Sequence, residues 1–388
     1  MSKLKKKNHN RDLLSIIFLM LISYMGPGFA TGTLTVNYFL SRGWIGVFIG
    51  PVIVGFLCFT FLFLLLEINR IFKPQNSNDA FMKIYSKTKV TGFVKSFKDI
   101  QLAVLLALAL SANISTVGIL FFDFFKIDYW MGALFFIFCL LIVAPLKNEL
   151  FRRISSVIGI CLMLIALLIA FICLPNSFEK MISFLNMSKT AVDFGHHSNI
   201  LAYINMLTIT VFFMNGYDAS VKASKEIILR KKDSFIIALG SSIILTVLTI
   251  LFTIIFSAGM PQILNVQVPT TWALTNLNHI AGGVNLIRLL YILFMFITCL
   301  GSSSSFLFTI TSRYYHSLKR IMPQSKSLTR KLVVELLSIV LCLALSTIGL
   351  LNLVKYGYSA YTIVVSGFIY LPLLVMVPLR LRNCVKNG

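Results

Sequence analysis

Ten apolar segments run along this chain, most of them close to 20 residues long, with short polar stretches between them. A helix needs about 20 apolar residues to cross the hydrocarbon core of a bilayer. The composition agrees, because 57% of the residues are hydrophobic and 12% are charged, against roughly 25% charged in soluble domains. We therefore predict an all-α integral membrane protein with ten transmembrane helices.

The apolar segments set the boundaries of the predicted spans. These are Leu13 to Phe39, Trp44 to Ile71, Ile100 to Phe125, Tyr129 to Leu146, Ile154 to Leu174, Ile200 to Ile228, Phe235 to Phe256, Val284 to Tyr314, Leu332 to Leu353 and Tyr358 to Leu379. We divide the chain into a basic N-terminus (1–12), a first five-helix repeat (13–174), an extracellular loop (175–198), a second five-helix repeat (199–379) and a C-terminus (380–388).

The basic residues predict the orientation, because Lys and Arg concentrate on the cytoplasmic side of a membrane. With the N-terminus inside, all but six of the 35 Lys and Arg residues fall on the cytoplasmic side. The six are Arg42, Lys126, Lys180, Lys189, Arg288 and Lys355. We expect a multi-pass cell-membrane protein with both termini in the cytoplasm. The charge lies in short clusters beside the spans, so it indicates the lipid bilayer as partner and not nucleic acid.

The first span is interrupted by Gly26-Pro27-Gly28 near its middle. Such a break frees backbone groups, which a membrane protein tolerates only where they are buried in protein or line a cavity. A simple kink is the alternative, since Gly and Pro are common in membrane helices. The sixth span contains a second break at Asn215-Gly216, at a similar depth. Paired broken helices in two halves are typical of the substrate site of secondary transporters. We therefore predict a 5+5 inverted repeat with discontinuous helices 1 and 6.

The chemistry of the two breaks predicts the substrate class. Amides at the start of a half-helix suit a carboxylate, and carbonyls of the opened sixth helix suit an ammonium group. A zwitterion fits both the amides and the carbonyls. We therefore expect the substrate to be an amino acid or a related small amine. The candidate substrate-binding residues are Gly26, Gly28, Phe29, Ala30, Thr31, Asn113, Phe212, Asn215, Gly216, Tyr217 and Asp218. Two alternatives stay open: the aromatic residues pack only, and Asp218 is a helix N-cap.

The motif Gly26-x-Gly28-Phe29-Ala30-Thr31-Gly32 resembles the first-helix signature of the YkvI-type permeases, within the amino acid-polyamine-organocation superfamily. The sixth span, with Asn215-Gly216-Tyr217-Asp218, is similar to the amino-acid permease pattern. The resemblance implies the LeuT-type fold of five plus five inverted helices. The chain departs from the signature at Leu34, where the family usually has Glu. Any role of that carboxylate is therefore absent or moved.

Four consecutive serines, Ser302 to Ser305, follow Gly301 in the eighth span. In sodium-coupled relatives with this fold, an eighth-helix carbonyl and two adjacent hydroxyls hold a cation with first-helix carbonyls. The resemblance thus implies a sodium site of Met25, Gly28, Gly301, Ser304 and Ser305. Close helix packing by small residues is the alternative. We expect no cofactor other than this coupling ion.

The sequence therefore predicts an ion-coupled permease that works by alternating access around the two breaks. The chain has no phosphate-binding loop and no nucleophile motif, so we predict that it is not an enzyme. A proton-coupled or exchange permease and a non-transporting sensor on the same scaffold remain as alternatives. The residues indicate no oligomeric state.

Overall fold

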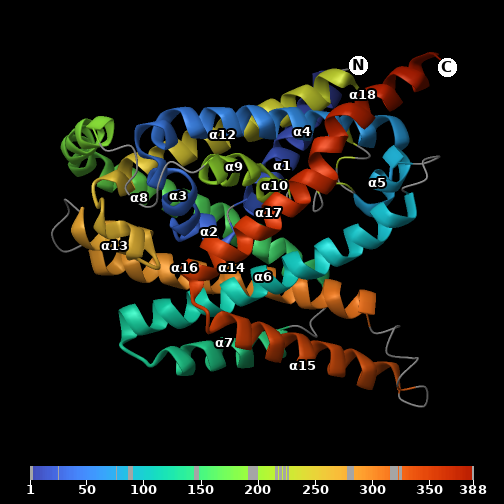
Figure 1. Ribbon diagram of the computed structural model, residues 1–388. Helices are drawn as coiled ribbons and strands as arrows, with labels where there is room; N and C mark the ends of the chain where they lie inside the picture. Colours follow the sequence, from blue (N-terminus) through green and yellow to red (C-terminus); the bar gives the residue numbers. More distant parts are fainter. Residues whose placement is uncertain are drawn as a thin grey trace.

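The structure is a computed structural model of the chain, in which every regular element of the described part is a helix. The described residues are 3–24, 26–75, 77–85, 91–143, 148–190, 200–214, 217, 221, 224, 227–277, 284–314, 322 and 326–386. Figure 1 shows long helices packed side by side, with the two ends of the chain at the same end of the bundle.

The first half of the chain forms helices separated by short connections. They are α1 (Lys3–Tyr24), α2 (Pro27–Ala30), α3 (Thr33–Tyr38), η1 (Leu40–Arg42), η2 (Ile45–Ile49), α4 (Gly50–Phe72), α5 (Ser77–Tyr85), α6 (Thr91–Phe125), α7 (Tyr129–Val143) and α8 (Asn148–Thr190).

The second half continues in the same way. Its elements are α9 (Ile200–Thr208), α10 (Thr210–Phe213), α12 (Lys231–Ser257), η3 (Gln262–Asn265), α13 (Pro269–Asn276), α14 (Val284–Tyr314), α15 (Ser327–Ser346), α16 (Leu350–Asn352), η5 (Leu353–Tyr358), α17 (Ser359–Val365), η6 (Ser366–Tyr370) and α18 (Leu371–Lys386).

Six helical stretches of the described part are long and apolar enough to cross a membrane. They are Ile45–Phe72, Gly92–Phe125, Leu164–Phe184, Lys231–Ser257, Leu286–Thr311 and Leu350–Arg382. Two shorter apolar stretches, Tyr129–Val143 and Ile200–Phe213, lie in other predicted spans. The chain is therefore an all-helical protein with several helices that can span a membrane.

The predicted end of the ninth span is wrong. The predicted ninth span ends at Leu353, whereas α15 ends at Ser346 and a new helix begins at Leu350. The reason is Gly349, whose φ of 85° is left-handed and turns the chain before the apolar residues that we assigned to the ninth span. The segment that we assigned to an extracellular loop is helical as far as Thr190, because α8 continues through Pro175.

The interrupted first span lies inside the bundle. The short helix α2 contacts α6 and α14, while α3 contacts α12 and η5. Around them α4 packs along α12, α8 packs along both α12 and α14, and α15 packs along α6. Figure 1 shows α2 and α3 in the middle of the view, with α4 and α12 on one side and α6 and α14 on the other. The break is thus surrounded by helices from both halves of the chain.

Candidate functional site

The break in the first span is real in the structure. Helix α1 ends at Tyr24, Gly26 is not helical, and the one-turn helix α2 follows. The amides of Phe29 and Ala30 both donate to the carbonyl oxygen of Gly26, at 3.0 Å each. The amides of Phe29 and Ala30 are therefore bonded within this one-turn helix. The carboxylate contact that we predicted for amides at the start of the half-helix remains a prediction.

A second interruption, which we did not predict, separates α2 from α3 at Thr31 and Gly32. Gly32 has a φ of 82°, a left-handed conformation that suits glycine. A Cβ built there would lie 2.4 Å from the Phe256 ring and 3.0 Å from Pro269 Cβ. Only glycine fits this position, because both the backbone conformation and the neighbouring atoms exclude a side chain.

Distant residues satisfy the carbonyls that this interruption leaves without helical partners. The oxygen of Ala30 accepts hydrogen bonds from Thr270 Oγ1 and from the Tyr291 hydroxyl, both at 3.0 Å. The oxygen of Thr31 accepts from the Thr270 amide at 3.0 Å. Thr33 Oγ1 donates to the Gln267 carbonyl at 2.7 Å. Helix α13, together with Gln267 just before it, therefore closes the second interruption at Thr31 and Gly32.

Gly28 lies against two side chains that the sequence analysis did not include in the site. A Cβ on Gly28 would be 2.9 Å from Leu34 Cδ1 and 3.5 Å from the Tyr358 ring. Leu34 is 1% exposed and fills this space. The position where the resembling family usually has Glu is therefore part of the packing beside the break. A carboxylate at this buried position would need a partner.

Aromatic rings pack against Tyr358 and against Phe29, on α2. The rings of Phe212 and Tyr358 stack with their centroids 4.5 Å apart. Phe29 meets Phe213 and Phe252 edge-on, at 6.2 Å and 5.7 Å between centroids. Tyr358 ends the π-helical segment η5, and π-turns are frequent at functional sites. The sequence signal for it was the stretch 356–361, which holds three tyrosines and one glycine and which we did not use.

Asn113, on α6, connects to the serine run of α14. Its side-chain nitrogen donates to Ser302 Oγ and Ser303 Oγ at 2.8 Å each, and to the Cys299 carbonyl at 3.3 Å. Asn113 is fully buried, and its carbonyl oxygen has no hydrogen-bond partner among the described residues. Because buried polar atoms are nearly always paired, this oxygen is available to accept a hydrogen bond or to contact a cation.

The two serines of the predicted sodium site lie in different environments. Ser304 is buried and donates to the Gly301 carbonyl at 3.1 Å, whereas Ser305 is exposed on the surface of α14. Gly28 contributes a carbonyl oxygen, which accepts from Thr31 Oγ1 at 3.3 Å. Of the two serines in the predicted set, Ser304 is buried and Ser305 is exposed, and the sodium site remains a prediction. In the described part of the chain, no three His, Cys, Asp or Glu side chains group into a metal site.

The second break falls partly outside the described residues. Helix α10 ends at Phe213, directly before it. Tyr217 is fully buried, and its hydroxyl donates to Asn69 Oδ1 of α4 at 2.7 Å. This bond ties the sixth span to α4, and we had expected Tyr217 to shape the substrate pocket. Four candidate site residues lie outside the described part: Met25, Asn215, Gly216 and Asp218.

Comparison with known proteins bears on the fold. No protein-family model and no curated protein matches the chain. Among solved structures, it is similar to a manganese transporter of Eremococcus coleocola in complex with an aromatic bis-isothiourea substituted compound. The TM-score is 0.58 at 17% identity, over 96% of this chain and 80% of that one. A Na+-coupled sialic acid symporter in a substrate-bound outward-open state gives a TM-score of 0.48 at 14% identity, over 96% and 86%. The chain has the fold of a membrane transporter.

Proposed function

We propose that this chain is a secondary active transporter that carries an amino acid or a related small amine by alternating access around its interrupted helices. One observation carries the proposal: the interrupted first span lies inside the bundle of a fold shared with a membrane transporter over 96% of the chain. Broken helices at this place are how such folds build substrate sites. The described side chains around the break are aromatic, hydroxyl and amide groups. These suit an organic substrate better than a transition metal, which prefers imidazole, thiolate and carboxylate ligands.

Asn113 supports an amine as the recognised group. Its buried carbonyl oxygen is without a partner in the described part, on a helix that contacts α2. A substrate ammonium would supply the missing donor, and a hydrogen bond to a charged group contributes about 1.5–3 kcal/mol. The stacked rings of Phe212 and Tyr358 offer an apolar surface to the rest of the substrate.

The test is uptake by purified protein in liposomes, with a panel of amino acids and small amines chosen by ligand-dependent thermal shift. Asn113→Leu keeps the volume and removes the acceptor together with the amide donor that binds the α14 serines, so substrate affinity should fall by about tenfold or more. The matched control is Asn352→Leu, because Asn352 is exposed and its side chain donates to the Ile348 carbonyl in the turn just before its helix. If no amine or amino acid is taken up, or if both variants bind substrate like the wild type, the proposed substrate class is wrong.

Sodium coupling is a separate part of the proposal. If Ser304 helps to hold sodium, Ser304→Ala should remove the sodium dependence of substrate affinity, since ion and substrate strengthen each other's binding equally. The expected coupling is roughly 5- to 150-fold. Ser305→Ala is the internal control, because Ser305 is exposed and should be silent. Uptake that responds equally to sodium and choline, but follows a pH gradient, would favour proton coupling; dependence on internal substrate would favour exchange.

We also propose that the chain crosses the membrane ten times, as two inverted five-helix repeats with both ends in the cytoplasm. The shared transporter fold and the distribution of basic residues support this arrangement. Single cysteines at positions 189 and 232 should react with impermeant reagents from opposite sides of the membrane. Labelling of both from one side would contradict the ten-span arrangement. The resemblance to the YkvI-type permeases remains a prediction.

A further inference from the structure

The side chain of Asn69, in the last turn of α4, links this helix to the part of the sixth span that follows the second break. Its carbonyl oxygen accepts from the Tyr217 hydroxyl at 2.7 Å, and its amide nitrogen donates to Ser224 Oγ at 2.8 Å. All three residues are fully buried. Both polar atoms of one amide are therefore bonded to a segment that is 148 and 155 residues away along the chain.

The two partners of Asn69 lie on one face of this segment. Tyr217, Val221, Ser224 and Ile228 follow one another at spacings of four, three and four residues, which places them on the same side of a helix. Each of them is at most 1% exposed. The Ile228 amide donates to the Ser224 carbonyl at 2.9 Å, as in a regular helical turn. Because Tyr217 and Ser224 are about two turns apart, bonds to both of them oppose rotation of the segment and sliding along α4.

Tyr217 connects this link to the second break. It directly follows the predicted break at Asn215-Gly216, which lies outside the described residues. The Tyr217 amide donates to the carbonyl of Met214 at 3.0 Å, so a backbone hydrogen bond crosses the break. Met214 is fully buried at the end of α10. The orientation of Tyr217 therefore affects the carbonyl on the other side of the break.

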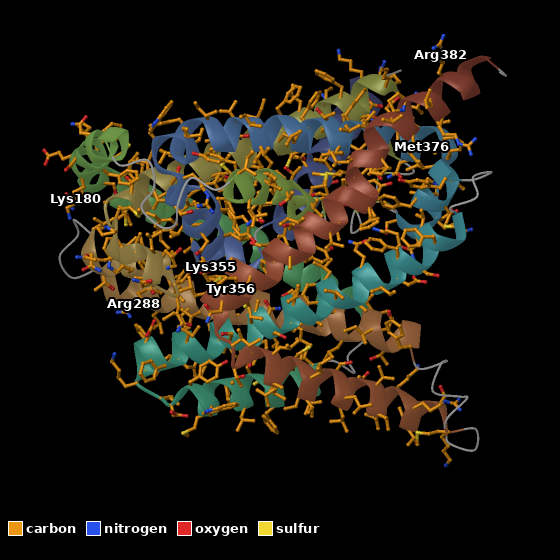
Figure 2. The ribbon with its side chains drawn as sticks, in the orientation of Figure 1. Lys180, Arg288, Lys355, Tyr356, Met376 and Arg382 are labelled. Carbon is orange, nitrogen blue, oxygen red and sulfur yellow. The ribbon has the colours of Figure 1, made fainter. Side chains whose placement is uncertain are left out.

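The part of the sixth span before the break makes contacts of another kind. Phe212 stacks on the Tyr358 ring, and Phe213 meets the Phe29 ring edge-on. Tyr358 is on the inner side of η5, where it is 1% exposed, whereas Tyr356 of the same segment is 62% exposed and lies at the surface (Figure 2). Aromatic contacts allow small displacements, whereas a hydrogen bond is directional. The directional contact therefore lies after the break.

We propose that Asn69 is a positioning residue of this protein. It fixes the orientation of Tyr217 and of the segment 217–228, and through them the backbone on both sides of the second break. In this role Asn69 acts through Tyr217 and does not touch the substrate. Only the effect on transport rests on the proposed function, because the position of the segment can be measured without a substrate.

Hydrogen–deuterium exchange of the purified full-length protein tests the position of the segment. Asn69→Leu and Tyr217→Phe should each raise exchange in the peptide that covers 217–228 by about two- to tenfold, the range for loss of one hydrogen bond. The double variant replaces both partners by apolar groups, which restores most of the stability lost when one polar partner is left behind. We expect its thermal unfolding midpoint to return toward that of the wild type while exchange in 217–228 stays raised. A merely structural contact would recover in both measurements.

Uptake by the protein in liposomes tests the effect on transport, with radiolabelled alanine, leucine and putrescine as probes. For a probe that is transported, Asn69→Leu should raise KM by about fivefold or more and change kcat less. The double variant should raise KM as much as either single variant, because all three lose the same link. If Tyr217→Phe raises KM and Asn69→Leu does not, the Tyr217 hydroxyl acts on the substrate directly and the proposal is wrong. If the wild type transports no probe, this outcome concerns the proposed function, and the exchange measurement decides the role of Asn69.

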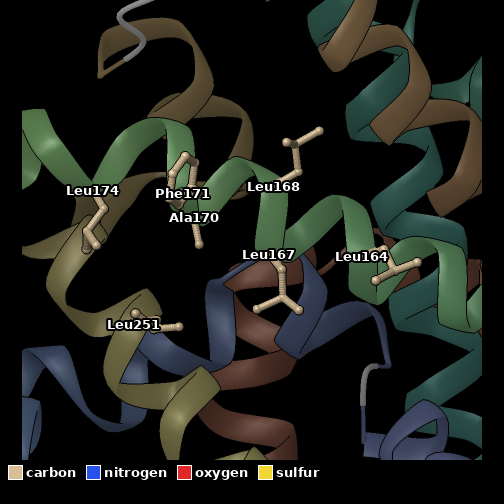
Figure 3. Close-up of a pocket in the computed structure, with 7 residues that line it drawn as sticks. All are labelled: Leu164, Leu167, Leu168, Ala170, Phe171, Leu174 and Leu251. Atoms are coloured by element: carbon tan, nitrogen blue, oxygen red, sulfur yellow. The ribbon is translucent and has the colours of Figure 1, made fainter.

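Two variants control for a general loss of stability. Tyr129→Phe removes a hydroxyl that donates to the Ser346 carbonyl at 3.1 Å and links α7 to α15, which Figure 1 shows on the opposite side of the bundle from α4. Leu167→Ala enlarges the apolar hollow between α8 and Leu251 of α12 (Figure 3). Neither should change exchange in 217–228. If both raise it as much as Asn69→Leu does, or if Asn69→Leu and Tyr217→Phe leave it unchanged, Asn69 does not position this segment.

Discussion

The two ends of the broken first span differ in how closely they are packed. At Gly26, no atom of the described residues lies within 4 Å of a built Cβ. At Gly32, a built Cβ would lie 2.4 Å from the ring of Phe256, and the backbone is left-handed. The Gly26 carbonyl serves the next turn of its own chain, whereas the Ala30 carbonyl is held by α13 and α14. Among the described residues, one end of the break is therefore satisfied by its own next turn, and the other is closed by tertiary contacts.

This difference gives the two glycines different roles. Gly26 is a residue where the chain leaves one helix, and its position requires no particular side-chain size from the described neighbours. Gly32 is required by its φ and by its neighbours together. In the predicted orientation α13 belongs to the loop on the extracellular side, so that orientation would place the packed end of the break toward the outside.

The largest effect should come from Gly32→Ala. The substitution forces a Cβ into a left-handed backbone and into contact with Phe256, and each of these costs about 1–3 kcal/mol. The thermal unfolding midpoint of the purified protein should fall clearly below that of the wild type. Unchanged stability would show that the packed end can rearrange, and the contrast between the two ends would be lost.

A smaller effect is expected from the two hydroxyls that bind the Ala30 carbonyl. Thr270→Val or Tyr291→Phe alone leaves one donor, so each should cost about 0.5–1.5 kcal/mol. The double variant leaves a buried carbonyl unpaired and should cost more than the sum of the single changes. A double-mutant cycle of unfolding free energies measures this coupling. Strict additivity would mean that the carbonyl finds another partner, and that the closure by α13 is not specific.

The smallest effect should come from Gly26→Ala. Gly26 lies between the end of α1 and Pro27, and the described neighbours leave room for a methyl group. Replacement of glycine at a compatible position stabilises by about 0.4–1 kcal/mol through the unfolded state, so the unfolding midpoint should stay the same or rise. A fall as large as that of Gly32→Ala would contradict the comparison directly.

The sequence predicted features that depend on nearby residues. The end of α1 before Gly26 and the end of α10 before Asn215 follow from glycine and proline in apolar runs, because these residues interrupt a helix wherever it packs. The whole of α14, from Val284 to Tyr314, matches its predicted span. The predicted end of the ninth span was less accurate. A single glycine, Gly349, turns the chain there, and no neighbouring proline marks the position in the sequence.

The serine run shows what the sequence alone does not specify. Four identical side chains in a row occupy every direction around a helix, so their composition contains no information about which of them face inward. The packing of α14 against α6 decides this: Ser302 and Ser303 meet Asn113, while Ser305 is exposed. Leu34 is similar, because its place beside Gly28 depends on the direction in which α3 leaves the second interruption.

The sequence by itself determined the helical membrane class, the approximate spans and the position of the first break, since these depend on hydrophobicity and on local backbone freedom. Only the tertiary structure decided how the break is completed. The Ala30 carbonyl is paired with Thr270 and Tyr291, which are 240 and 261 residues away along the chain. Glycine and proline predict that backbone groups become free of the helix, but which groups pair with them depends on how distant helices pack together.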